Sequence, residues 1–115
     1  MSWSTRVARA TAVVLVALAS ACTSDHQSPT DVVQTTSVTI ANFAFSPASI
    51  SVSAGSTVTW TNTDATAHTT TSDAAGWDSG AIAQNGSFAH TFNTKGTFTY
   101  HCSIHPNMTA TVTVQ

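Results

Sequence analysis

The chain has 115 residues, with three lysines and arginines against five aspartates and glutamates, and a formal net charge of −2. This length holds at most one domain of ordinary size. So few cations exclude the basic surface that a nucleic-acid-binding protein needs, and they leave solubility and partner choice to a small number of groups.

Residues 1–21 have the pattern of a secretory signal peptide. Arg6 and Arg9 precede the apolar run ATAVVLVALA at 10–19, which is too short to cross a bilayer, and small residues follow it. We therefore expect cleavage after Ala21 and export to the periplasm or to the outer face of a bacterial membrane. The exported chain would keep Lys95 as its one strong cation against five aspartates.

Cys22 stands directly after the expected cleavage point. The segment LASAC at 18–22 resembles a bacterial lipoprotein processing site, in which the cysteine is lipidated and tethers the protein to a membrane. Ala19 occupies the position where a large aliphatic residue is usual, so ordinary cleavage without a lipid remains the alternative. Residues 22–36 are polar and read as a flexible linker, although an edge strand beginning at Val32 and Val33 is also open.

From Ser37 onward the apolar residues alternate with polar ones at a period of two, which is the pattern of half-buried β-strands. Threonine and valine are frequent, and turns recur at short intervals. This combination predicts an all-β domain over residues 37–115, built from antiparallel strands in a sandwich or small barrel, and we expect it to be a monomer. The alternating sets are Val38 and Ile40; Ile50 and Val52; Val58 and Trp60; Phe88, His90 and Phe92; Phe98, Tyr100 and Cys102; Ala110, Val112 and Val114.

The segment YHCSIHPNM at 100–108 carries the strongest chemical signal. Cys102, His105 and Met108 have Cys-x2-His-x2-Met spacing, immediately before the last alternating stretch. A thiolate, an imidazole and a weak thioether are the donors that suit a mononuclear copper ion cycling between Cu(I) and Cu(II). Such a site needs a second histidine from elsewhere, and His68 is the leading candidate. His101 should point to the opposite face of its strand.

Each of these residues also has a plain structural interpretation. A lone buried cysteine is usually a small hydrophobic residue, and Met108 could fill the core. Their joint spacing, together with a distant histidine, makes chance a poor explanation. Zinc is the rival metal, but thioether is a poor zinc ligand and only one thiolate is at hand. A disulfide between Cys22 and Cys102 would consume the thiolate.

The stretch FTYHCSIHPNMTATVTV at 98–114 resembles the ligand loop of plastocyanin- and amicyanin-type cupredoxins, and its short spacing is most similar to the amicyanin type. The resemblance extends over residues 37–115, including IANFAFSP at 40–47 and GSTVTWTN at 55–62. It implies a Greek-key β-sandwich holding one type 1 copper ion. It further implies that His68, Cys102 and His105 are strong ligands and that Met108 is a weak axial one.

Ile104 departs from the pattern of many relatives, which have proline between the cysteine and the histidine. Proline has no amide hydrogen, whereas isoleucine has one. We therefore hypothesise that the Ile104 amide donates a hydrogen bond to the Cys102 sulfur, beside one from the Thr69 amide. Such hydrogen bonds reduce electron donation by the sulfur and should raise the reduction potential.

The pattern as a whole predicts a carrier of single electrons between a redox donor and a redox acceptor protein. His105, on the loop, would be the ligand nearest the surface through which the electron passes. The alternative is a protein that binds or delivers copper without an electron-transfer role. We expect no enzyme activity, because the sequence offers no recognisable general base or substrate loop.

Overall fold

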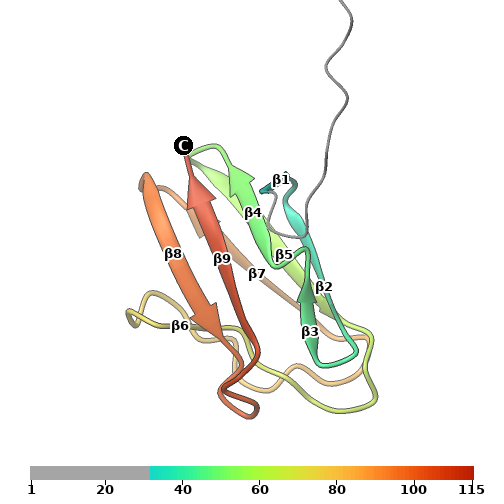
Figure 1. Cartoon of the computed structure of the whole chain (residues 1–115). Helices are drawn as coiled ribbons and strands as arrows, with labels where there is room; N and C mark the ends of the chain where they lie inside the picture. The colour runs from blue at the N-terminus through green and yellow to red at the C-terminus, as the bar shows by residue number, and fades with distance from the viewer. Residues whose placement is uncertain (1–31) are drawn as a thin grey trace, which may run out of the picture.

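The computed structural model describes residues 32–115, which form two β-sheets packed face to face (Figure 1). No helix occurs in this part of the chain, and so none that is long and apolar enough to cross a membrane. The strands are β1 (Val33–Gln34), β2 (Ser37–Ala41), β3 (Ala44–Ser46), β4 (Ser49–Val52), β5 (Ser56–Asn62), β6 (Thr71–Ser72), β7 (Ser87–Phe92), β8 (Gly96–His101) and β9 (Thr109–Val114).

One sheet has the strand order β1-β4-β9-β8-β6 and the other the order β3-β2-β5-β7. The expected all-β sandwich is confirmed, but the expectation of purely antiparallel strands is wrong. The pairs β1–β4, β4–β9 and β2–β5 run parallel. Parallel pairing needs a crossover connection, and here the chain passes from one sheet to the other at every connection except β2–β3 and β8–β9.

The N-terminal residues of the chain bear on several of the expectations above. The signal peptide at 1–21 and the lipidation of Cys22 lie outside the described residues and stay predictions. The end of the expected linker lies within them, and there Val33 and Gln34 pair with Ile50 and Ser51 of β4. The open alternative of an edge strand is therefore what the structure contains at this point.

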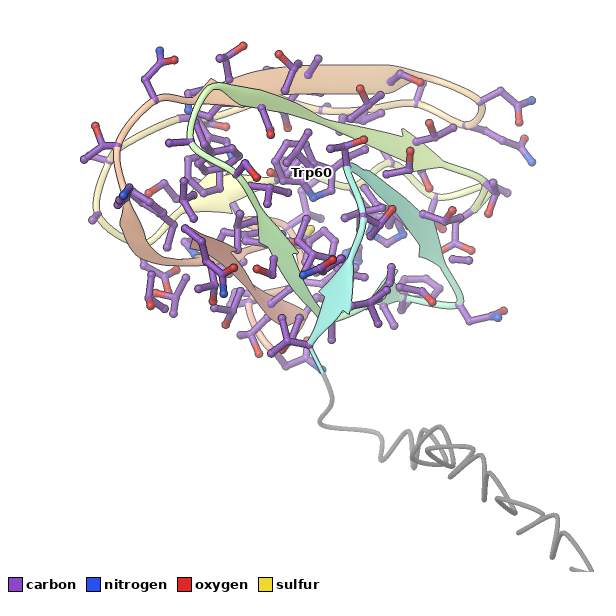
Figure 2. All side chains as sticks on the ribbon, turned by 90° about the horizontal axis from the view of Figure 1, so that it is seen from above. Trp60 is labelled. Carbon is purple, nitrogen blue, oxygen red and sulfur yellow. The ribbon has the colours of Figure 1, made fainter. Side chains whose placement is uncertain are left out.

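The core lies between the sheets and follows the predicted alternation. On β5 the side chains of Val58, Trp60 and Asn62 are completely buried, while their neighbours on the strand are partly exposed or exposed. The same alternation holds on β9, and on β8 it leads through Tyr100 to Cys102. Figure 2 shows Trp60 in the packed interior between the two layers.

Three connections gather at one end of the sandwich, opposite the C-terminus (Figure 1). They are the β8–β9 loop, the long segment between β5 and β6, and the turn between β2 and β3. The β8–β9 loop joins two strands of the first sheet, and the β2–β3 turn joins two strands of the second. The β5–β6 segment runs from the second sheet to the first. This end of the molecule is therefore where side chains from both sheets can meet.

Candidate metal centre

Cys102 follows directly after β8 and continues its inward-facing set of residues. Its side chain is a free thiol that is completely buried. The Cys102 amide donates a 3.0 Å hydrogen bond to the carbonyl of Met108, which extends the β8–β9 pairing by one step beyond His101 and Thr109. The hairpin therefore fixes the backbone on which the sulfur stands.

The β8–β9 loop turns between Cys102 and Met108. Pro106 fits this turn because it has no amide hydrogen to satisfy, and the Met108 amide closes the turn with a 2.9 Å hydrogen bond to the His105 carbonyl. Met108 is buried and His105 is half-buried. The loop thus turns its methionine inward and leaves its histidine at the surface of the sandwich end.

His68 enters the same region from the segment between β5 and β6. Its backbone makes a two-way bridge with Ile82, with nitrogen–oxygen distances of 3.2 and 2.7 Å, and its side chain is completely buried. Asn62, at the end of β5, braces this segment. Its amide nitrogen donates to the carbonyls of Thr66 and Ile82 at 2.9 Å, and its side-chain oxygen accepts the Asp64 amide at 2.9 Å.

Asp64 determines which nitrogen of His68 faces the site. Its Oδ2 lies 2.9 Å from His68 Nε2, so Nε2 carries the proton and donates it. The Nδ1 lone pair is then left to face Cys102 and His105. The Phe43 amide above all, and also that of Asn42 and the His68 ring, hold the pKa of Asp64 below its usual value despite partial burial.

Three donor atoms converge between the two loops. His68 Nδ1 lies 3.2 Å from His105 Nδ1 and 3.9 Å from the Cys102 sulfur, and the sulfur lies 3.7 Å from His105 Nδ1. The ligand atoms of these residues all lie within 4.8 Å of one another. They form a nearly equilateral triangle, which is the arrangement that a three-coordinate metal ion requires.

The Cys102 sulfur is tuned by the groups around it. Burial raises the pKa of the thiol, but the amides of Thr69 and His105 and the two imidazoles outweigh this effect and lower the pKa from 9.0 to about 6. The Thr69 amide lies 3.3 Å from the sulfur, as expected from the sequence. The thiolate is therefore favoured at neutral pH even before a cation is bound.

The second amide at the sulfur corrects the sequence-based hypothesis. Within residues 32–115 the hydrogen bonds of the sulfur do not include one from the Ile104 amide, and the loop amide that lowers the Cys102 pKa is that of His105. Ile104 itself is about half exposed, at 48%.

Thr69 anchors the ligand loop through its hydroxyl as well as its amide. Its Oγ1 accepts a 2.7 Å hydrogen bond from the Ser103 amide and lies 3.0 Å from the Ser103 hydroxyl. Thr69, which donates to the Cys102 sulfur, is thus also hydrogen bonded to Ser103, the residue that follows Cys102. The His68 segment and the ligand loop are joined directly, without help from a metal.

The remaining histidines of the described region lie outside this cluster. His101 is hydrogen bonded to Asp73 on the outer face of β8, as its alternation predicted. His90 is half-buried and stacks on Trp77, with ring centroids 5.1 Å apart. Neither ring approaches the converging donors.

Some residues at the site were not singled out by the sequence reasoning. Asp64 has one local signal, its position four residues before His68. Asn62 and Phe43 have none, because their roles depend on contacts across the fold. Phe43 packs against the rings of both His68 and His105, with centroid distances of 5.1 and 5.0 Å.

The donor set fits copper better than zinc. It offers two imidazole nitrogens and one thiolate, with a buried thioether residue at the end of the same loop. Soft thiolate with imidazole suits copper, and a trigonal set with a weak axial thioether is typical of blue-copper sites. A zinc site would favour a carboxylate or a second thiolate, but the Asp64 carboxylate is engaged with Nε2 on the far side of the His68 ring.

Comparison with known proteins gives the cupredoxin family that the ligand loop resembles. The model of the cupredoxin-like domain matches residues 11–114. Amicyanin-alpha of Methylorubrum extorquens AM1 is 34% identical over 88 residues, which cover 70% of this chain and 71% of that protein.

Solved structures agree with this match. A variant of amicyanin in its oxidised state has a TM-score of 0.65 at 30% identity, covering 69% of this chain and 80% of that one. A purple cupredoxin from Nitrosopumilus maritimus has a TM-score of 0.63 at 30% identity, covering 69% of this chain and 98% of that one. The fold, the converging donors and these matches together show that the chain belongs to the cupredoxin-like family and that its cofactor is one type 1 copper ion.

Proposed function

We propose that this protein carries single electrons between two redox proteins in an extracytoplasmic compartment. The ligands are His68 Nδ1, Cys102 Sγ and His105 Nδ1, with Met108 as a weaker fourth. The observation that carries this proposal is the triangle of donor atoms 3.2, 3.7 and 3.9 Å apart around a buried, low-pKa thiol.

Rigid ligands are what a carrier needs. Copper bound here would supply a centre that gains and loses one electron with little change in its preferred geometry. The chain's contribution is to hold the donors still. Asp64 fixes the His68 tautomer, and the Thr69 amide, from the segment that carries His68, donates a hydrogen bond to the sulfur. Ordering of the ligands therefore accompanies folding and does not have to accompany each electron transfer.

The surface around His105 suits brief docking. Two of the three large exposed apolar side chains in the described region flank this ligand: Phe43 is 51% exposed and Ile104 is 48% exposed. Pro106 and Asn107 border them and carry no charge. A small uncharged patch of this kind favours weak, short-lived contact with a redox partner whose own contact face is apolar.

Export is part of the same proposal and rests on residues 1–21. Cys22 would then be either a lipidated membrane tether or the plain N-terminus of a soluble monomer. The mass of the mature N-terminal peptide distinguishes the two, because a lipid adds hundreds of daltons to an unmodified cysteine.

The function is tested by adding Cu(II) to the purified protein. We expect an intense blue or purple colour from thiolate-to-copper charge transfer, which bleaches on reduction and returns on oxidation over repeated cycles. Cys102→Ser should abolish the colour, while Asn107→Ala on the same loop should keep it. Copper binding without a reversible colour change would favour the alternative, a copper-handling protein. Absence of copper binding would refute both.

A further inference from the structure

Phe43 is an exposed aromatic residue with an unusual set of neighbours. It lies in the turn between β2 and β3, in the sheet that does not contain the ligand loop. Although 51% of its surface is exposed, its ring meets His68 and His105 edge to face, at interplanar angles of 89° and 83°. One side chain from one sheet thus contacts both imidazoles of the site.

The turn that presents Phe43 is held in a restricted conformation. Asn42 and Phe43 both have left-handed backbone angles, with φ of 53° and 57°, and such angles persist in bulky residues only where surrounding contacts impose them. Here the contacts come from Asp64. Its Oδ1 accepts the Asn42 amide at 2.8 Å, and its Oδ2 accepts the Phe43 amide at 2.9 Å.

The same carboxylate also binds His68 through Nε2, at 2.9 Å. Asp64 therefore connects the Phe43 turn to the ring on which Phe43 rests. Asp64, Phe43 and His68 therefore contact one another in all three pairs: the Phe43 and His68 rings pack together, and one carboxylate binds both residues. Among residues 32–115, no carboxylate holds the His105 ring as Asp64 holds that of His68. The His105 ring stands on the surface loop and packs against the rings of Phe43 and His68.

We propose that Phe43 is a positioning residue for the copper ligands, held by Asp64, and that its ring keeps His105 in its coordinating orientation. The inference rests on the proposed function, because it assigns His105 as the exposed copper ligand. An edge-to-face contact gives the imidazole a directional neighbour, which an aliphatic side chain of similar size does not. Loss of the ring frees His105 to rotate about its side-chain bonds while the protein remains folded.

The test compares Phe43→Ala, Phe43→Leu and Phe43→Tyr with the unchanged protein. The first readout is the charge-transfer spectrum and the electron paramagnetic resonance of the Cu(II) form. The second is the rate at which the Cu(I) form loses its metal to a strong chelator. The third is the spread of His105 ring-proton signals in the metal-free protein, measured by nuclear magnetic resonance.

We expect Phe43→Ala and Phe43→Leu to lose copper roughly two- to tenfold faster, the range that removal of one aromatic pair produces. Their copper spectra should be altered and their His105 signals broadened or doubled. Phe43→Tyr should restore all three readouts, because its ring keeps the edge-to-face contact. Asp64→Asn, which keeps the aromatic ring but removes a carboxylate acceptor, should change them in the same direction as Phe43→Ala.

Val32→Ala is the matched control, since Val32 is equally exposed at 53% and lies on the approach to β1. It should leave every readout unchanged. A blue wild-type protein whose Phe43→Ala form has the same spectrum, copper-loss rate and His105 signals would overturn the inference. A Phe43→Leu protein with the wild-type spectrum, copper-loss rate and His105 signals would also overturn it, because an apolar side chain without a ring would then be enough. A wild-type protein that gives no colour would refute the proposed function instead.

Discussion

The indole nitrogen of Trp60 donates a 3.1 Å hydrogen bond to the hydroxyl of Tyr100 across the interior of the sandwich. The two residues stand on β5 and β8, which belong to different sheets, and both are completely buried. Two residues beyond Tyr100 lies Cys102. The hydrogen bond therefore fixes the spacing of the sheets close to the strand that carries the sulfur.

Tyr100→Phe should reduce the free energy of unfolding by about 1–3 kcal/mol, because it leaves the buried Trp60 N–H without a partner. Every buried side-chain nitrogen and oxygen among residues 32–115 has a partner, so this would be a new defect. Denaturant unfolding of the metal-free protein measures it. Trp60→Phe and the double variant complete a cycle that isolates the hydrogen bond. A Tyr100→Phe protein as stable as the original would contradict the assignment.

The phenol of Tyr100, the single tyrosine of the chain, should resist ionisation in the folded protein. Burial raises its pKa well above the usual value of 10.0, against a smaller lowering by the Trp60 hydrogen bond. The folded state keeps the proton longer than the unfolded chain does. The stabilisation contributed by the protonated Tyr100 phenol is therefore fully present below pH 10, and it is lost as the pH rises above 10 through the higher pKa of the folded state. Absorbance of the phenolate should appear together with unfolding, not before it.

The metal-free protein should become more stable between about pH 6 and pH 9. The Cys102 pKa is about 6 in the fold against 9.0 without it, so the unfolded thiol holds its proton over this range and the folded one does not. The stabilisation is complete above pH 9 and is lost as the pH falls through 6.

The control for this pH dependence is Cys102→Ser, unfolded at the same series of pH values. His90, whose pKa is lowered by burial, is present in both proteins, so the difference between them reports Cys102. The difference should grow from pH 6 to pH 9. A difference that does not vary with pH would show that the folded thiol is not acidic.

Asn62→Ala should destabilise the protein and weaken copper binding together. The change removes the donor to the Thr66 and Ile82 carbonyls and the acceptor of the Asp64 amide, and each buried group left unpaired costs about 1–3 kcal/mol. The segment carrying His68 then loses its brace. Unfolding free energy and copper affinity are the measurements, and Asn93→Ala, at an exposed turn, is the control. Lower stability with unchanged copper affinity would mean that the Asn62 hydrogen bonds do not position His68 for copper binding.

The ligand loop was predictable because its information is local. The alternation Phe98, Tyr100, Cys102 fixed the inward direction of the sulfur, and the spacing to His105 and Met108 placed all three within one hairpin connection. His68 was found as a candidate through the chemistry that a copper site requires. Its approach to the loop is confirmed by the 3.2 Å separation of the two imidazole nitrogens.

The remaining parts of the site depend on contacts between distant segments. Parallel pairing of β4 with β9 joins residues about 60 positions apart, and no local period reveals it. The Asp64 carboxylate meets the Phe43 amide 21 positions away, at a turn whose left-handed backbone is unmarked by glycine. The difference between the Ile104 and His105 amides is a matter of one turn's backbone angles, which residue identities do not specify.

The strand order determines when the first sheet can be completed during synthesis of the chain. β9 stands between β4 and β8 in the first sheet, yet it follows both in the sequence. A chain growing from its N-terminus therefore holds that sheet as two unjoined parts until residue 114 has been made. The ligand loop immediately precedes this strand, so pairing of β9 both joins the two parts of the sheet and fixes the end of the loop that carries Cys102, His105 and Met108.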